Sequence, residues 1–330
     1  MADRLLVLGW HNVESTWLFP SRPGAGPQGL ERQLRFLRRY TNVMDLREAL
    51  AALATGRPLP ARAVAITFDD GYRDQLELAV PMLERLGLPA TFFLIPGLLS
   101  RVVRPWWELI AWAFLRASRD AVTWEGTVWP LRSAVERRTS LLAVAEQLKR
   151  RGGASRDAAL EELTALLAPG GDPADDKMFL DWDGARRLAR GRLTIASHTF
   201  YHAILSRENE QTQLHDLLLS RQQLEQELEI KVDLLAYPNG RLGDYDDTTM
   251  TAARRAGYTH AITTLPGWNR PSTPPYEVLR FVQQPERGVP GLAIVPLHPV
   301  RTRLPVGSWP GRRSSSGWAW RSRLRRLRQK

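Results

Sequence analysis

Short apolar runs and longer amphipathic stretches alternate along most of the chain. The apolar runs have the length of single strands and are rich in Val, Ile, Leu and Phe, which is typical of buried strands. They lie at residues 5–9, 63–68, 90–95, 193–197, 232–237 and 259–264. Apolar residues spaced three or four apart predict helices at residues 30–40, 45–54, 74–86, 182–189, 208–229 and 246–256. Because strands and helices alternate, the pattern favours a mainly parallel α/β sheet or barrel.

This alternation of predicted strands and helices is interrupted in two places. Residues 100–178 are helix-prone, with helices predicted at 133–151 and 156–167, so we interpret this segment as a helical insertion between two strands. Residues 286–330 are dominated by Pro, Gly, Arg and Ser, which indicates a flexible tail. We therefore expect a barrel-like body over residues 1–285, followed by a basic tail.

The net charge of the chain is carried by that tail. The 330 residues hold 46 Lys plus Arg and 35 Asp plus Glu, a formal net charge of +11. Up to Glu286 the two counts are equal at 35, whereas residues 287–330 hold 11 basic residues and no acidic one. We expect no nucleic-acid partner, since no nucleic-acid-binding fold accompanies this charge. Trp318 and Trp320 beside arginines fit either peripheral contact with an anionic membrane or a solvated terminus.

Composition sets a few further limits. The chain has no cysteine, so any metal site must use His and carboxylates. The apolar residues 5–10 are too few for a signal peptide. Residues 106–115 are interrupted by Glu108 and are too short for a membrane span. We therefore expect a cytoplasmic protein, at the inner face of the membrane if the tail binds lipid, and infer no obligate protein partner.

Two adjacent carboxylates end the strand predicted at residues 63–68. Asp69 and Asp70 follow this strand directly, and Gly71 permits a sharp turn after them. The carboxyl ends of parallel strands are where sites assemble in α/β folds. Neighbouring carboxylates repel each other, so one of a pair usually binds a cation or shares a proton. The alternative interpretation is an acidic N-cap of the following helix.

Histidines follow two other predicted strands. His198 and His202 come directly after the strand at 193–197, and two imidazoles four residues apart can meet at one metal ion. His11 follows the first strand, and a single His in such a place is more often structural than catalytic. These histidines gain meaning only in combination with the carboxylates.

The turn after the strand predicted at residues 232–237 has a special sequence. Tyr237, Pro238, Asn239 and Gly240 stand there in a row. A kinked loop of this kind could aim the N–H of Asn239 into a site as an oxyanion donor, and an ordinary Pro-Asn-Gly turn fits as well.

Taken together, these residues indicate hydrolytic chemistry. One Asp and two His supply the three ligands of a catalytic zinc site, whose remaining position is left to water. Such a metal lowers the pKa of water to about 7 and polarises a carbonyl. A second Asp is then available as a base and a further His as an acid, a combination that hydrolyses amides or esters.

These motifs resemble those of the polysaccharide deacetylases, the NodB-homology or carbohydrate esterase family 4. The resemblance runs from about residue 5 to 285. It rests on Thr-Phe-Asp-Asp-Gly at 67–71, Leu-Pro-Ala-Thr-Phe-Phe at 88–93, Ser-His-Thr at 197–199 with His202 and Leu205, and Ala-Tyr-Pro-Asn-Gly at 236–240. It implies an α/β fold, a distorted (β/α) barrel of about seven parallel strands with the helical insertion and the basic tail added.

The resemblance also implies roles for individual residues. It makes Asp69 the catalytic base, gives the metal to Asp70, His198 and His202, and gives the oxyanion to the backbone N–H of Asn239.

One position departs from the family pattern. The family often has an Arg two residues before the Pro of the third motif, where it orients the base, and this chain has Ala236 instead. Arg280 is the candidate replacement, and we expect Tyr237 and Arg280 beside the substrate or behind the reacting groups.

The general acid has two candidates. Many family members use a late His, for which His298 is the candidate, flanked by prolines beyond the expected barrel. Another branch, which includes bacterial poly-N-acetylglucosamine deacetylases, looks circularly permuted and has its His in an early Tyr-His-x-Val-like motif. Trp-His-Asn-Val stands at 10–13, well before the Asp pair, and we therefore prefer His11.

The sequence thus predicts a metal-dependent hydrolase that removes N-acetyl groups from an amino-sugar-containing polysaccharide or glycan precursor. Zinc is the expected metal, and Co, Ni or Fe would suit the same ligands. Two alternatives stay open. One is hydrolysis of a non-sugar amide, and the other is a barrel that binds glycan without turnover, which the missing Arg at position 236 favours.

Overall fold

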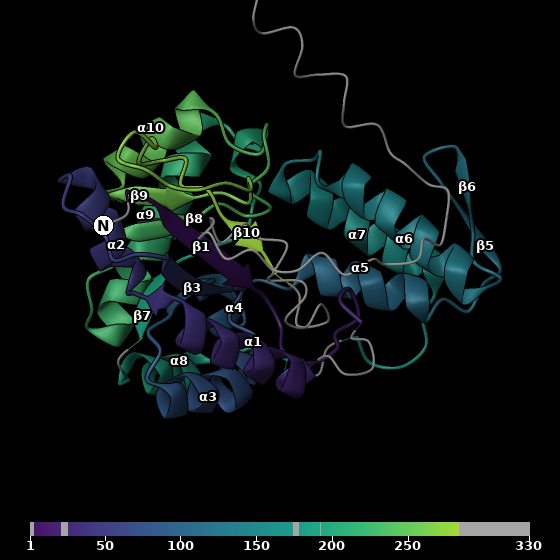
Figure 1. Cartoon of the computed structure of the whole chain (residues 1–330). Helices are drawn as coiled ribbons and strands as arrows, with labels where there is room; N and C mark the ends of the chain where they lie inside the picture. Colours follow the sequence, from purple (N-terminus) through teal and green to yellow (C-terminus); the bar gives the residue numbers. More distant parts are fainter. Residues whose placement is uncertain (1–2, 21–25, 174–177, 192, 284–330) are drawn as a thin grey trace, which may run out of the picture. The chain divides into compact units, whose positions relative to one another are not determined.

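The computed structural model describes residues 3–20, 26–173, 178–191 and 193–283. Within these residues, parallel strands form a curved sheet in the order β10-β1-β3-β4-β7-β8-β9, and β2 pairs with the start of β3 (Figure 1). The strands are β1 (Leu5–Trp10), β2 (Asn42–Val43), β3 (Ala63–Asp69), β4 (Thr91–Leu94), β7 (Thr194–Ser197), β8 (Leu234–Ala236), β9 (His260–Ile262) and β10 (Phe281–Val282). The distorted parallel barrel expected from the sequence is confirmed.

The chain returns from the last strands to the first one. Val278 forms a parallel bridge with Ile262 of β9, and β10 then pairs with β1. Arg280 lies between these two contacts. The two-residue strands β2 and β10 were not predicted, because so short a pairing leaves no periodic pattern in the sequence.

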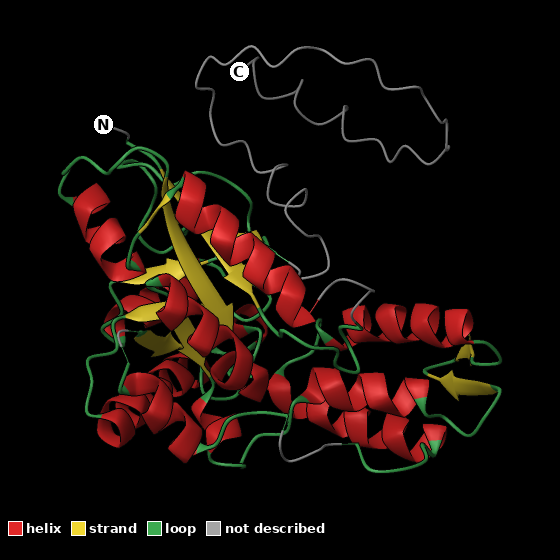
Figure 2. Cartoon of the chain, turned by 60° about the horizontal axis from the view of Figure 1, so that its bottom comes forward, coloured by secondary structure: helices red, strands yellow, loops and turns green. Residues whose placement is uncertain are grey.

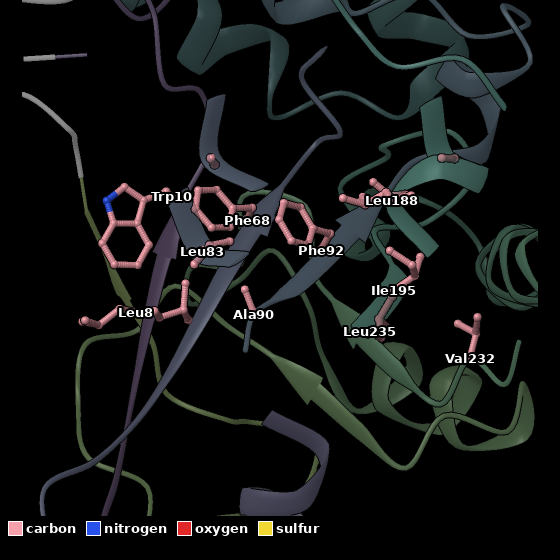
Figure 3. Close-up of a cluster of buried hydrophobic side chains, with 14 of the residues drawn as sticks. Leu8, Trp10, Phe68, Leu83, Ala90, Phe92, Leu188, Ile195, Val232 and Leu235 are labelled. Carbon is pink, nitrogen blue, oxygen red and sulfur yellow. The ribbon is translucent and has the colours of Figure 1, made fainter. Parts of the chain in front are cut away.

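Strand residues alternate between the inside of the barrel and the surrounding helices. Leu5 and Val7 of β1 belong to a buried cluster that includes α2 (Leu46–Ala54), which covers the starts of the strands. Trp10 belongs to the larger outer cluster drawn in Figure 3. There the rings of Trp10, Phe68 and Phe92 stack in sequence, with centroids 5.8 and 5.0 Å apart. This stacking packs the carboxyl-terminal parts of β1, β3 and β4 against one another, beside the turns that carry the site residues.

Amphipathic helices cover the outer face of the sheet. They are α1 (Gly26–Tyr40), α3 (Val80–Leu86), α8 (Trp182–Ala189), α9 (Glu210–Leu228) and α10 (Asp247–Arg255), with short turns at α4 (Pro96–Leu99) and η2 (Leu205–Arg207). Side chains of Asp181, Asn209 and Asp246 accept hydrogen bonds from the first turns of α8, α9 and α10, as N-caps do.

The helix predicted at residues 74–86 has two parts. It begins with a π-helical turn, η1 (Gln75–Ala79), and continues as α3, which ends at Gly87 in the left-handed conformation with φ +62°. Turns of π-helix are rare in proteins, and those that occur are often found at functional sites. Here the turn directly follows the Asp pair at the end of β3.

In the sequence, a helical segment with its own buried cluster follows α4 and precedes α8. Its helices and its two-stranded hairpin lie together beside the sheet and the helices that cover it (Figures 1 and 2). The segment contains α5 (Trp106–Leu115), β5 (Ala121–Trp124), β6 (Thr127–Pro130), α6 (Ala134–Leu148) and α7 (Gly153–Leu167). The hairpin β5–β6 was not predicted. Its turn is Glu125-Gly126, and both residues have positive φ, which suits a tight antiparallel turn. The division into a barrel over residues 1–285, which includes this inserted segment, and a basic tail over residues 286–330 stays a prediction.

Helix α5 explains the longest apolar run of the sequence. Its residues are buried nearly all round, because α6 and α7 both pack against it, and a helix enclosed in this way is apolar on every face. None of the described helices is long and apolar enough to cross a membrane.

Candidate active site

The Asp pair sits in a sharp turn at the end of β3. Asp69 is the last residue of the strand and is buried. Asp70 and Gly71 both have positive φ, at +73° and +74°, a conformation that Asp and Gly accept more readily than most residues. The turn separates the two neighbouring carboxylates, so that each meets a different set of partners.

Asp69 is paired with Arg280. The guanidinium donates two hydrogen bonds, from Nη1 to Oδ1 and from Nη2 to Oδ2, both 2.7 Å long. Arg280 is fully buried, and its Cδ passes over Gly9, where an added Cβ would lie 2.9 Å from it. Arg280 therefore supplies Asp69 with a buried cation, the role that the family pattern gives to an Arg at position 236.

The charges around Asp69 keep it ionised. Burial alone would raise its pKa, but Arg280, with His198 and His11, outweighs burial and holds the pKa of Asp69 below its ordinary value. A bidentate carboxylate–arginine pair is among the strongest polar contacts in proteins. Asp69 is therefore an anion at neutral pH although it has almost no contact with bulk water.

Asp70, His198 and His202 converge on one point. Each offers a ligand atom, and the three atoms lie within 4.8 Å of one another. The Nε2 atoms of His198 and His202 are 3.4 and 3.5 Å from Asp70 Oδ1. This buried oxygen has no hydrogen-bond partner among the described residues. A buried acceptor is rarely left unpaired, and one Asp oxygen with two imidazole nitrogens is a common donor set for a divalent metal. The residues present fit such an ion.

The protonation states of this cluster are shaped by burial and by mutual charge. Burial opposes ionisation of Asp70, but His198, His11 and His202 outweigh it and place the pKa of Asp70 well below its usual range. Burial lowers the pKa of His202 to about 3, against the attraction of Asp70. An ionised Asp and a neutral His are the forms that bind metals.

The loop that carries the two histidines is held by contacts with β8 and α9. His198 Nδ1 lies 2.8 Å from the carbonyl oxygen of Ala236, a contact that turns Nε2 toward Asp70. Asp216 of α9 accepts from the backbone N–H groups of Phe200 and Tyr201. Thr199 and His202 have positive φ, so the loop needs these supports to hold its shape.

Helices of the inserted segment complete the support of His202. The ring of Trp107, from α5, lies 4.2 Å from the His202 ring. Arg156, from α7, donates to the His202 carbonyl oxygen at 3.3 Å. Trp107 is itself fixed, because its Nε1 donates to the hydroxyl of Tyr72, which donates to Glu108. The inserted segment is therefore part of the site.

His11 faces Asp69 from the end of β1. Its Nε2 lies 3.9 Å from Asp69 Oδ2, and its side chain is 26% exposed, so it opens to the pocket. Gln75 Nε2 donates to the carbonyl oxygens of both His11 and Asp69, at 2.6 and 2.5 Å. Asp74 accepts from the N–H groups of Val13 and Glu14. The first turn after β3 thus fixes the loop after β1.

The Tyr-Pro-Asn-Gly turn lies beside the cluster. Asn239 has φ +61°; its carbonyl oxygen accepts from Thr264 Oγ1 at 2.7 Å, and its side chain donates to Asp244 at 2.5 Å. Asn239 and Tyr237 both line the pocket described below. The hydroxyl of Tyr237, however, donates to the carbonyl oxygen of Tyr276 at 3.2 Å, so this group acts in the scaffold.

The two carboxylates and the three histidines open into one pocket of about 530 Å³, a usual size for a ligand site. Asp69, Asp70, His11, His198 and His202 line its inner part. Its other walls are Leu18, Phe19, Trp106, Trp107, Arg138, Leu142, Ala145, Glu146, Lys149, Ile204, Tyr237, Pro238, Asn239, Arg241, Thr264 and Val282.

The structure brings together most of the residues singled out in the sequence. Asp69, Asp70, His11, His198, His202, Tyr237, Asn239 and Arg280 all lie at or directly behind this pocket. His298 lies outside the described residues. Sequence reasoning missed the supporting residues Asp74, Gln75, Trp107, Arg156 and Asp216. Of these, only Asp74 and Gln75 had a signal, since they follow the Asp pair closely.

Comparison with known proteins gives matches over much of the chain. A model of the family described as "Polysaccharide deacetylase" matches residues 56–261. The poly-beta-1,6-N-acetyl-D-glucosamine N-deacetylase of Escherichia coli K12 is 31% identical over 91 residues, which cover 26% of this chain and 13% of the relative. The chain therefore matches only a small part of that longer relative.

Two solved structures have the same fold. The deacetylase PplD of Streptococcus pyogenes, in complex with acetate, aligns with a TM-score of 0.60 at 17% identity, covering 91% of this chain and 100% of PplD. IcaB of Ammonifex degensii aligns with a TM-score of 0.57 at 22% identity, covering 90% and 99% of the two chains.

Proposed function

Because the chain belongs to the polysaccharide deacetylase family, we propose that it is a metal-dependent hydrolase that removes N-acetyl groups from a carbohydrate. The observation that carries the proposal is the arrangement of two carboxylates in one pocket. Asp69 is held by Arg280, while Asp70 meets two histidines. One acid is therefore kept for proton transfer and the other for ligation.

Asp70, His198 and His202 are the residues that would hold the metal. When bound, a divalent ion supplies Lewis acidity, which lowers the pKa of water and polarises an amide carbonyl. Zinc suits two imidazoles and one carboxylate, and Co, Ni or Fe suit the same donors.

Asp69 and His11 are suited to move the protons. Asp69 accepts a proton from water as the water oxygen attacks the carbonyl carbon of the acetamide, and Arg280 keeps this base ionised and oriented. The backbone N–H of Asn239 is suited to donate to the oxygen that becomes negative. His11 then gives a proton to the nitrogen while the C–N bond breaks, which yields acetate and an amine.

Arg280 also bears on the two alternatives. A barrel that only binds glycan drew support from the Arg missing at position 236, and a buried Arg on the same acid removes that support. Hydrolysis of a non-sugar amide would use the same groups, so only substrates can separate it from the proposed reaction.

The test is acetate release by the metal-loaded full chain. We expect release from oligomers of N-acetylglucosamine, little from small acetylated amines, and loss of release after chelation that returns when metal is added. Release from the small amides alone would favour the non-sugar hydrolase. No release from any compound by protein that holds a full equivalent of metal would overturn the proposal.

A further inference from the structure

The apolar helix α5 carries one charged residue, Glu108, and this residue is buried. Its carboxylate meets donors from two other parts of the chain. The hydroxyl of Tyr72 donates to Oε1 at 2.8 Å, and the backbone N–H of Leu18 donates to Oε2 at 3.1 Å. Burying a carboxylate is costly unless hydrogen bonds satisfy it. Here both oxygens are satisfied, and together they join two segments of the barrel to the inserted helix.

The contact with Tyr72 leads to the cluster of proposed metal ligands. Tyr72 directly follows the Asp-Asp-Gly turn at the end of β3. Its hydroxyl donates to the carboxylate and accepts a hydrogen bond from Trp107 Nε1 at 2.8 Å. The ring centroids of Trp107 and His202 are 4.2 Å apart. The Tyr72 hydroxyl therefore fixes the indole that lies against this imidazole.

The contact with Leu18 leads to the opposite side of the pocket, where His11 lies. Leu18 belongs to a tight turn at residues 16–19. The N–H of Thr16 donates to the carbonyl oxygen of Phe19, and the N–H of Phe19 donates to Thr16 Oγ1, both at 3.0 Å. Leu18 and Phe19 line the pocket, and the ring centroids of Phe19 and His11 are 5.7 Å apart. The N–H of Leu18 thus anchors a pocket wall to α5.

We propose that Glu108 is a positioning residue that holds both sides of the pocket from one buried point. Through Tyr72 it fixes the ring beside His202, and through Leu18 it fixes the wall beside His11. The two tasks need a carboxylate, because it accepts hydrogen bonds at two oxygens whereas a side-chain amide has one. The inference rests on the proposed function, since it takes this pocket to bind metal and substrate.

The two contacts can be broken separately. Tyr72→Phe removes the hydroxyl and leaves the contact with Leu18. Glu108→Gln keeps the size of the side chain but accepts from only one of the two donors, and Glu108→Ala accepts from neither. Ser140→Ala is the matched control. Ser140 is buried in the same inserted segment, its hydroxyl donates to the carbonyl oxygen of Pro130 at 2.9 Å, and it is not among the residues that line the pocket.

The zinc affinity of the full chain reports on the side of the pocket that holds His202. It is measured by competition titration without substrate. We expect Tyr72→Phe and Glu108→Ala each to weaken zinc binding by about 10- to 100-fold, as is usual when the support behind a metal ligand is lost. Ser140→Ala should bind zinc as the wild type does.

The KM for N-acetylglucosamine oligomers at saturating zinc reports on the wall formed by Leu18 and Phe19. Glu108→Ala frees this wall and should raise KM by about tenfold, which corresponds to the loss of one hydrogen bond. Tyr72→Phe should keep the KM of the wild type, because it leaves this contact in place. Glu108→Gln should lose zinc affinity, raise KM, or do both. If Glu108→Ala does not fold, the two conservative variants carry the test.

The positioning role and the proposed function fail in different ways. Zinc affinity and KM in Tyr72→Phe and Glu108→Gln equal to those of Ser140→Ala would overturn the positioning role. A similar rise of KM in Tyr72→Phe and Glu108→Ala would also overturn it, since a general loosening of the fold does not distinguish the two sides. Wild-type protein that holds zinc and releases no acetate would overturn the proposed function, and the zinc affinities of the variants would still decide the role of Glu108.

Discussion

At the scale of single residues, the notable feature is how the chain provides a cation for Asp69. Family members often place this Arg near the Pro of the third motif, and this chain has Ala236 there. Arg280 reaches the same acid from the segment that follows β9 and precedes β10, the strand that pairs with β1. Its path lies over Gly9, where any larger side chain would meet Arg280 Cδ. A change in one motif is thus compensated by two residues far away in the sequence.

We predict that Arg280→Gln disables the base. Without the guanidinium, burial dominates and raises the pKa of Asp69 above its ordinary value, so the acid limb of the pH–rate profile moves to higher pH. Removing one partner of a buried pair also costs about 3–5 kcal/mol of the free energy of unfolding. In Arg280→Lys, the acid limb and the free energy of unfolding should lie between those of the wild type and of Arg280→Gln, because an ammonium cannot form the bidentate contact. An unmoved acid limb in Arg280→Gln would contradict this role.

The same variant should change how stability depends on pH. In the wild type the pKa of Asp69 is depressed in the folded state. Its ionisation therefore stabilises the fold above the unfolded pKa, and this contribution is lost as pH falls through the folded pKa. In Arg280→Gln the folded pKa lies above the unfolded one, so stability is instead lost as pH rises through it. Thermal melts at a series of pH values would reveal the opposite slopes.

At the scale of elements, the site is made by loops that follow strands and are fixed by helices. The positions of these strands and helices could be predicted, because hydrophobic periodicity is a local property of the sequence. The shapes of the loops could not be predicted in this way. The positive φ of Thr199 and His202 has no signature in those residue types, and Asp216 lies in the middle of an ordinary helical pattern although it holds the loop from behind.

We predict that Asp216→Ala weakens metal binding while the overall fold persists. Two backbone N–H groups of the loop lose their acceptor, so His198 and His202 are no longer held together. Loss of such a supporting contact typically costs about 10- to 100-fold in metal affinity. Asp183→Ala on α8 removes an exposed acid and is the matched control. Equal zinc affinities of the two variants in a competition titration would refute the supporting role.

At the scale of the whole molecule, the site depends on residues from the beginning and from the end of the sequence that forms the barrel. The family match covers residues 56–261, whereas His11 and Arg280 lie outside it. Arg280 and Asp69 are 211 residues apart in the sequence, and only closure of the sheet brings them together. The sequence therefore named Arg280 as a candidate cation for the base Asp69, but the bidentate contact between the two side chains follows only from the tertiary structure. The same holds for the wall that α6 adds to the pocket.

The two candidates for the general acid, His11 and His298, lie near opposite ends of the sequence. We predict that His11→Ala lowers kcat by about 10²- to 10⁴-fold, the usual value of a positioned acid or base. We expect His298→Ala to keep kcat close to that of the wild type, because His11 already faces Asp69 across 3.9 Å. Steady-state kinetics of the two variants in the full chain decide the matter. The reverse result would assign the acid to His298.

The central claim is that one carboxylate of the pair serves the chemistry and the other serves the metal. The most direct test measures bound metal and acetate release on the same samples of wild type, Asp69→Asn and Asp70→Asn. We predict that Asp69→Asn keeps about one equivalent of metal and loses turnover by orders of magnitude, whereas Asp70→Asn loses both. Full turnover by Asp69→Asn, or unchanged metal content in Asp70→Asn, would contradict it.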